Sequence, residues 1–273
     1  MPLPIVDTRR FFHPLTREIV AVLRSADDDQ WERQTLAGSW QVRDVAAHLI
    51  DTALRRLSFH RDGASAPRPS PGQDFVAFIN ELNATWTRAA RRLSPRVLTG
   101  LYAEAGSSLA EFVETLDLEA PAFFPVSWAG GDSRQWLDIG REFTEVWHHG
   151  AQIRDALGAG PFSDPEWLRA VLQIAMHALP HAYQDVAAAD GASVTIRVSG
   201  PSSGAWTLQR SGVGWSIDEG EASGAAAAIS LDDEIAWRVL FNALPPSEAE
   251  PLVRIDGNTA LGRRILHVRA VIV

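Results

Sequence analysis

The hydrophobic pattern of this chain changes its period once, and that change restricts the fold more than any other feature of the sequence. Up to about residue 183, apolar residues recur every three or four positions, which is the spacing of amphipathic helices. From residue 193 onward, short runs of alternating character are separated by Gly and Ser clusters, which is typical of strands. Helices followed mainly by strands predict an α+β fold.

The same patterns predict the individual elements. Helices are expected over residues 14–26, 42–60, 75–93, 95–116, 133–158 and 164–183. Strands are expected in the runs SVTIRV, AWTLQR, VGWSID, AAISLD and LVRID, and further helices in DDEIAWRVLFNAL and NTALGRRILHVRA. Long helices joined by loops describe a bundle, and the later part describes a small α+β unit with an antiparallel sheet.

A shift in composition near residues 184–193 marks the expected domain boundary. We therefore expect a helix-bundle domain over residues 1–160, a connecting helix over 161–183, and a C-terminal α+β domain over 184–273.

Charge and residue content exclude several classes of function. The chain has 34 acidic and 25 basic residues and a net charge of −9, so a basic surface for nucleic acid is not expected. The absence of Cys excludes disulfides, zinc ribbons and a cysteine nucleophile. No run approaches the roughly 18 apolar residues of a membrane span, and the first residues lack a signal-peptide pattern. We expect a cytoplasmic protein with no membrane partner, whose ten Trp residues lie in its cores.

Three side chains are candidate metal ligands. Glu145 and His149 are four residues apart and therefore share one helix face, and His48 lies on another expected helix. One carboxylate and two imidazoles inside a bundle would suit Zn²⁺ or another divalent ion with an open coordination position. The ordinary alternative is a partly exposed Glu–His pair and a buried, hydrogen-bonded His48. His148 is a second candidate for the ligand on this helix, although the helical phase favours His149.

Several segments resemble one known family. SWQVRDVAAHL resembles the signature GWTVRDLxAHL of the DinB-like, mycothiol-dependent maleylpyruvate isomerase family, and REFTEVWHHGAQIRDALG resembles its second signature. LPHAYQDV, WTLQRSGVGWSI, AWRVLFNAL and VRIDGNTALGRRIL resemble later stretches of the family in the same order. The resemblance implies a DinB-like four-helix bundle followed by a small α/β domain similar to sterol carrier proteins. It also implies a divalent metal, usually zinc, on His48, Glu145 and His149.

The family's activity supplies the functional expectation. The resemblance implies an enzyme that uses mycothiol, a small thiol, to isomerise maleylpyruvate or to form an S-conjugate of a small, carboxylate-bearing electrophile. The candidate catalytic residues are arginines of the C-terminal domain that could bind carboxylates: Arg238, Arg254 and Arg263. Two alternatives stay open, a non-catalytic protein that binds metal and thiol, and a metal-assisted hydrolase that uses water.

Three positions depart from the family pattern. Gln41 stands where Thr is common and is a poorer N-cap, and His148 replaces an apolar residue. Gln152 stands where an Asp often follows the second ligand histidine. We expect Gln152 to orient His149, although an amide accepts a hydrogen bond more weakly than a carboxylate does.

Overall fold

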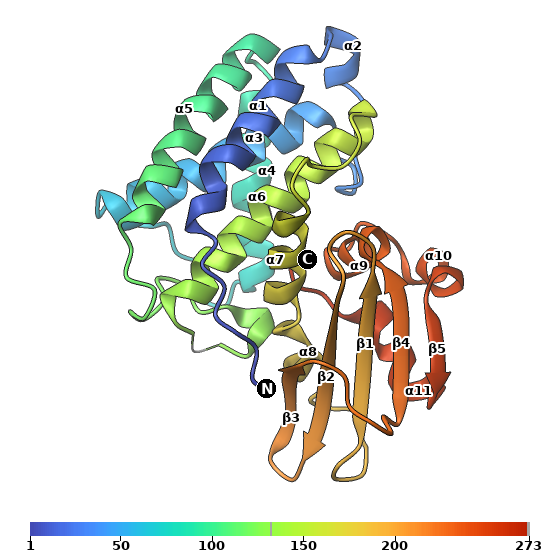
Figure 1. Cartoon of the computed structure of the whole chain (residues 1–273). Coiled ribbons are helices and arrows are strands. Elements are labelled where there is room, and N and C mark those ends of the chain that lie inside the picture. Colours follow the sequence, from blue (N-terminus) through green and yellow to red (C-terminus); the bar gives the residue numbers. More distant parts are fainter. Residues whose placement is uncertain (132, 272–273) are drawn as a thin grey trace. The chain divides into compact units, whose positions relative to one another are not determined.

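The computed structural model describes residues 1–131 and 133–271 (Figure 1). Its backbone contacts divide the chain into two compact units. The helical unit comprises Thr8–Leu118 and Glu145–Ser163, and the sheet-containing unit comprises Met1–Asp7, Glu119–Thr144 and Asp164–Val273. The α+β fold class is confirmed. The division of the chain into domains with boundaries at residues 160 and 184 stays a prediction.

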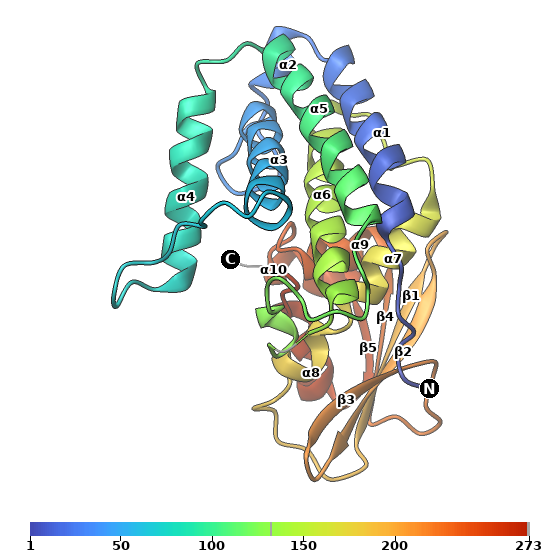
Figure 2. The same cartoon turned by 90° about the vertical axis from the view of Figure 1, so that its left-hand side faces the viewer.

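The helical unit is built from long amphipathic helices. They are α1 (Phe12–Ser25), the short α2 (Asp28–Trp31), α3 (Val42–Arg56) with its π-helical continuation η2 (Leu57–Arg61), α4 (Phe75–Ala90), α5 (Pro95–Glu114) and the second part of α6 (Gln135–Leu157). A short 3₁₀ turn, η1 (Arg9–Phe11), precedes α1. α5 packs against α1 and α3, and α4 lies at the outer side of α3 (Figure 2). Their apolar stripes form a core in which Leu15, Ile19 and Leu49 are fully buried.

The start of α3 is held by a carboxylate rather than by its N-cap side chain. The Gln41 N–H donates to Asp44 Oδ2 (3.2 Å), and the Asp44 carboxylate also accepts two hydrogen bonds from the Arg91 guanidinium (2.9 and 2.8 Å). Asp44 is buried, so this two-fold contact ties the first turn of α3 to the end of α4. It explains how α3 begins at Val42 although Gln41 is a poor N-cap residue.

A glycine allows α6 to approach α1 closely. A Cβ atom on Gly150 would lie 2.6 Å from Ile19 Cδ1 and 2.8 Å from Phe162 Cζ, which is closer than carbon atoms can pack. Ile19 is fully buried, and Trp147 packs its ring against Phe162 (5.7 Å between centroids). The missing side chain therefore brings the backbone next to His149 into contact with the core of the helical unit.

The sheet-containing unit holds five strands in the order β3-β2-β1-β4-β5. They are β1 (Ser193–Ser199), β2 (Gly204–Ser211), β3 (Gly214–Glu219), β4 (Ala227–Asp232) and β5 (Arg254–Gly257). Ile196 of β1 lies opposite Trp206 of β2 and Ile229 of β4. One pair differs from the expected antiparallel arrangement, because β1 and β4 run parallel and make the sheet mixed. Because β1 and β4 are parallel, the chain must cross over after β3. The alternation of apolar and polar residues within a single strand does not predict such a connection.

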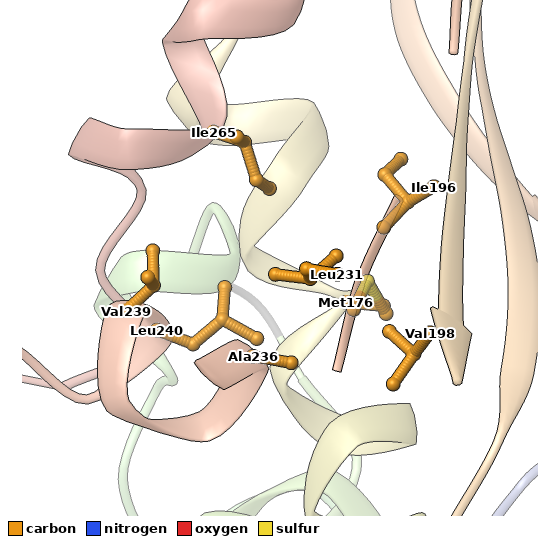
Figure 3. Close-up of a pocket in the computed structure, with 8 residues that line it drawn as sticks. All are labelled: Met176, Ile196, Val198, Leu231, Ala236, Val239, Leu240 and Ile265. Carbon is orange, nitrogen blue, oxygen red and sulfur yellow. The ribbon is translucent and has the colours of Figure 1, made fainter. Parts of the chain in front are cut away.

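The same unit also contains several helices and turns. They are the first part of α6, η3 (Ser127–Ala129), α7 (Pro165–Ala175), α8 (Ala178–Ala182), α9 (Asp233–Leu240), α10 (Pro246–Ala249), η4 (Glu250–Leu252), α11 (Thr259–Arg263) and η5 (Arg264–His267). A small pocket lies between β1, β4, α9 and η5 (Figure 3). Only apolar side chains line it: Met176, Ile196, Val198, Leu231, Ala236, Val239, Leu240 and Ile265. It belongs to the core of this unit. Among the residues described, no helix is both long and apolar enough to cross a membrane.

His177, at the start of α8, is a mostly buried titratable group. Its ring packs edge-on against Trp136 (5.2 Å between centroids), and its Nε2 atom is buried without a hydrogen-bond partner in the described structure. Burial disfavours the charged imidazolium and lowers the pKa of His177 from 6.5 to about 4. Between pH 4 and pH 6.5 the unfolded chain binds more protons at this residue than the folded chain does. The contribution of His177 to the free energy of unfolding is therefore fully present above pH 6.5 and is lost as the pH falls.

We therefore expect the stability of the wild type to depend on pH through His177. Between pH 7 and pH 4.5 its free energy of unfolding should fall by about 2–3 kcal/mol more than that of His177→Gln, which has no imidazole to protonate. Urea unfolding of both proteins at the two pH values measures this difference. Equal losses in the two proteins would show that His177 does not titrate in this way.

Candidate metal centre

Two helices bring the three predicted ligands together. His48 projects from α3, and Glu145 and His149 project from successive turns of α6. Glu145 Oε1 lies 2.9 Å from His48 Nε2 and 3.3 Å from His149 Nε2. The ligand atoms offered by the three residues all lie within 4.8 Å of one another. Tetrahedral ligand atoms around Zn²⁺ lie about 3.3 Å apart, so this spacing is of the size that an ion would bridge.

Burial and hydrogen bonding set the charges of the cluster. Burial disfavours the charged carboxylate of Glu145, but hydrogen bonds with His149 and His48 outweigh it and hold the pKa of Glu145 well below its usual value. Burial lowers the pKa of His48 below 6.5, against the opposing effect of Glu145. At neutral pH the cluster therefore contains one carboxylate and a neutral His48 imidazole, and both of these are forms that bind metal.

Gln152 determines which nitrogen of His149 faces the cluster. Its Oε1 atom lies 2.8 Å from His149 Nδ1 in a buried contact, as the departure from the family pattern led us to expect. An amide oxygen can only accept, so Nδ1 carries a proton and Nε2 is the ring nitrogen that faces Glu145 Oε1. The Nε2 atom lies 3.3 Å from Glu145 Oε1, the same oxygen that His48 Nε2 approaches, so all three potential ligand atoms face one point. The donor set thus fits a metal ion.

The other histidine on this turn lies outside the cluster. His148 is buried and its ring lies 4.0 Å from that of His149, centroid to centroid, but its nitrogen atoms are not part of the group that could hold an ion. Of the two histidines that the sequence left open, the structure places His149 beside Glu145 and His48.

Sequence reasoning missed Trp40, which we expected to be an ordinary core residue. Its ring lies against both imidazoles, 4.9 Å from His48 and 6.1 Å from His149 between centroids. The only signal was its position eight residues before His48, within the first signature segment.

The three predicted arginines lie in the sheet-containing unit, and each has a carboxylate partner there. Arg238 lies 3.8 Å from Glu234 and covers the ring of Trp237. Arg254 pairs with Asp256 (3.0 Å), and Arg263 pairs with Glu250. These contacts are those of ordinary surface ion pairs, and a role toward substrate stays a prediction for all three.

A known protein family matches this part of the chain. The family model described as the mycothiol maleylpyruvate isomerase N-terminal domain matches residues 12–154, which is 143 of the 273 residues. The chain belongs to this family. The match to the mycothiol maleylpyruvate isomerase N-terminal domain contains His48, Glu145 and His149 together with Trp40 and Gln152. No curated protein sequence is similar enough to this chain to count as a match.

Two solved structures share the fold of this member of the mycothiol maleylpyruvate isomerase N-terminal domain family. One is a crystal structure of the mycothiol-dependent maleylpyruvate isomerase, and the other is a histidine-to-alanine mutant of that enzyme. Their sequence identities to this chain are 14% and 13%, and each has a TM-score of 0.57 over 93% of both chains. At this identity the likeness shows a common fold over nearly the whole length.

Proposed function

We propose that this protein binds a divalent metal ion, most simply Zn²⁺, and catalyses mycothiol-dependent isomerisation of a small, carboxylate-bearing electrophile such as maleylpyruvate. The observation that carries the proposal is the meeting of His48, Glu145 and His149 from two helices inside the matched region. S-transfer to the same class of electrophile shares the first half of the reaction and belongs to the same proposal.

Each residue of the cluster has a distinct part. Glu145 supplies the single negative charge, His48 supplies a neutral nitrogen donor, and His149 supplies its Nε2 atom as the third ligand. Gln152 keeps the proton of His149 on Nδ1, so Nε2 stays available to the ion. When bound, an ion with an open coordination position lowers the pKa of a thiol that binds there, so that the thiol loses its proton. Three protein ligands are the number that leaves such a position open.

The sulfur must come from a small molecule, because the chain contains no Cys. In the proposed reaction the thiolate adds to one carbon of a cis double bond that is conjugated to a carbonyl, which forms a C–S bond and an enolate. Rotation about the resulting single bond and loss of the same thiolate give the trans isomer, so no atom is gained or lost. If a proton reaches the enolate before the thiolate leaves, the product is the S-conjugate. Arg238, Arg254 and Arg263 are proposed to bind carboxylates of thiol or substrate.

The test is turnover with each component omitted in turn. Metal-loaded protein is mixed with mycothiol and maleylpyruvate, and isomer conversion is followed by absorbance with controls that lack thiol, lack protein or contain a chelator. Conversion that needs both metal and thiol supports the proposal, and accumulation of an S-conjugate supports its transferase form. Turnover without thiol would favour metal-assisted hydrolysis, and stoichiometric metal without any turnover would favour a binding protein; either result overturns the proposal.

A further inference from the structure

The two histidines of the cluster are held in different ways. The Nδ1 atom of His149 is bonded to Gln152, whereas the Nδ1 atom of His48 is buried and has no hydrogen-bond partner among the described residues. A histidine that binds metal almost always has its second nitrogen bonded to a carboxylate, a carbonyl or water, which fixes the orientation of the ring. Among the described residues, the ring of His48 is therefore hydrogen-bonded only at Nε2, to Glu145 Oε1 (2.9 Å), and this is the nitrogen that an ion would occupy. With an ion bound, a contact of another kind must hold the ring.

The indole of Trp40 is the side chain placed to do this. Its ring centroid lies 4.9 Å from that of His48, with the ring planes tilted by 53°. It also stacks on His149 at 6.1 Å with an angle of 30°. The two imidazoles lie nearly perpendicular to each other, at 79°, and belong to different helices. One aromatic surface thus contacts both nitrogen ligands of the proposed metal centre.

Trp40 is itself held firmly by the loop that carries it. Its carbonyl oxygen accepts hydrogen bonds from the Thr35 N–H (3.0 Å), the Thr35 hydroxyl (2.8 Å) and the Gln34 amide (3.2 Å). The backbone N–H of Trp40 donates to Ala37 O (3.0 Å), and this bond closes a tight turn that contains Gly38 at a φ of 60°. Three donors on one carbonyl fix the backbone position from which the indole projects.

We propose that Trp40 is a positioning residue that orients the imidazole of His48, and secondarily that of His149, for metal binding. The inference rests on the proposed metal site. The indole restricts rotation of the His48 ring by contact, and so keeps Nε2 directed at Glu145 in place of the absent hydrogen bond at Nδ1. The indole also lies against one side of the cluster.

The test compares metal binding by four variants with that of the wild type. Trp40→Ala removes the aromatic contact, Trp40→Phe keeps part of it, and Thr35→Val removes one donor to the Trp40 carbonyl at equal shape. Trp31→Phe is the control, because Trp31 is a fully buried tryptophan of the helical unit outside the ring contacts of the cluster. Co²⁺ affinity is measured by competition with a chromophoric chelator, and the visible spectrum of bound Co²⁺ reports the ligand geometry. Circular dichroism shows that each variant is folded.

We expect Trp40→Ala to bind Co²⁺ about 10- to 100-fold more weakly than the wild type and to change the visible spectrum. Trp40→Phe should lie between the two, and Thr35→Val should weaken binding by a few-fold, to about 10-fold at most. Trp31→Phe should keep wild-type affinity even if it lowers stability.

Three results would overturn the inference, and they can be told apart. If the wild type and Trp40→Ala bind Co²⁺ with equal affinity and identical spectra, Trp40 has no positioning role and the proposed metal site stands. If Trp40→Ala does not fold, the same equality between Trp40→Phe, Thr35→Val and the wild type excludes the positioning role instead. If the wild type binds neither Co²⁺ nor Zn²⁺, both the metal site and the inference fall.

Discussion

Replacing His149 with alanine is expected to remove metal binding and thiol-dependent turnover together. Apparent binding free energies of structural zinc sites are about 10–16 kcal/mol for four ligands, so one ligand is worth about 2.5–4 kcal/mol. Loss of Nε2 should therefore weaken metal affinity by roughly 100- to 1,000-fold. Elemental analysis of the purified variant measures metal content, and the isomerisation assay measures turnover.

His148→Ala is the matched control for this experiment. It removes an adjacent buried imidazole whose nitrogen atoms lie outside the candidate ligand group. We expect it to keep stoichiometric metal, whatever it costs in stability. Metal retained by His149→Ala but lost from His148→Ala would reverse the assignment of the ligand and contradict the observed geometry of the cluster.

Replacing Gln152 should change metal affinity in a direction that depends on the substituent. Gln152→Leu removes the acceptor of the His149 Nδ1 proton, which leaves a buried N–H unpaired and frees the ring to adopt the other tautomer. We expect affinity to fall by about 10- to 100-fold. Gln152→Glu restores an acceptor and makes it charged, so its affinity should equal or exceed that of the wild type.

Chelator competition at one fixed pH measures both variants, and thermal unfolding of the metal-free proteins separates a loss of binding from a loss of fold. Unchanged affinity in Gln152→Leu would mean that the amide does not control the tautomer. Weaker binding in Gln152→Glu than in Gln152→Leu would mean that the site does not tolerate a second carboxylate.

Much of the fold could be predicted because its elements depend on local patterns. Alternation in SVTIRV and AWTLQR places β1 and β2 within one or two residues of their observed bounds. The parallel pairing of β1 with β4 could not be predicted, because the register of Ile196 with Ile229 depends on a connection and not on either strand. The helix expected over 164–183 is interrupted after Ala175, since Pro180 has no N–H to donate to Met176.

The candidate site likewise has features that could be predicted from the sequence and features that could not. The spacing of Glu145, His149 and Gln152 along one helix places them on the same side of α6, so their proximity could be predicted. The contact of Trp40 with His48 could not, because it depends on the folding back of the loop that Thr35 and Gly38 shape. The unpaired Nδ1 atom of His48 depends on what packs around it, and single-residue patterns carry no such information.

The tight contact at Gly150 means that helix packing constrains the backbone that carries His149. The donors are then assembled before an ion arrives, whereas a zinc finger acquires its shape only when it is loaded. For a protein that binds metal as proposed, folding and metal loading would then be separate events. An ion could be removed and a different one supplied without unfolding the protein. The metal found in any one preparation would therefore depend on which ions were supplied and how the protein was handled, and not on which ion was present during folding.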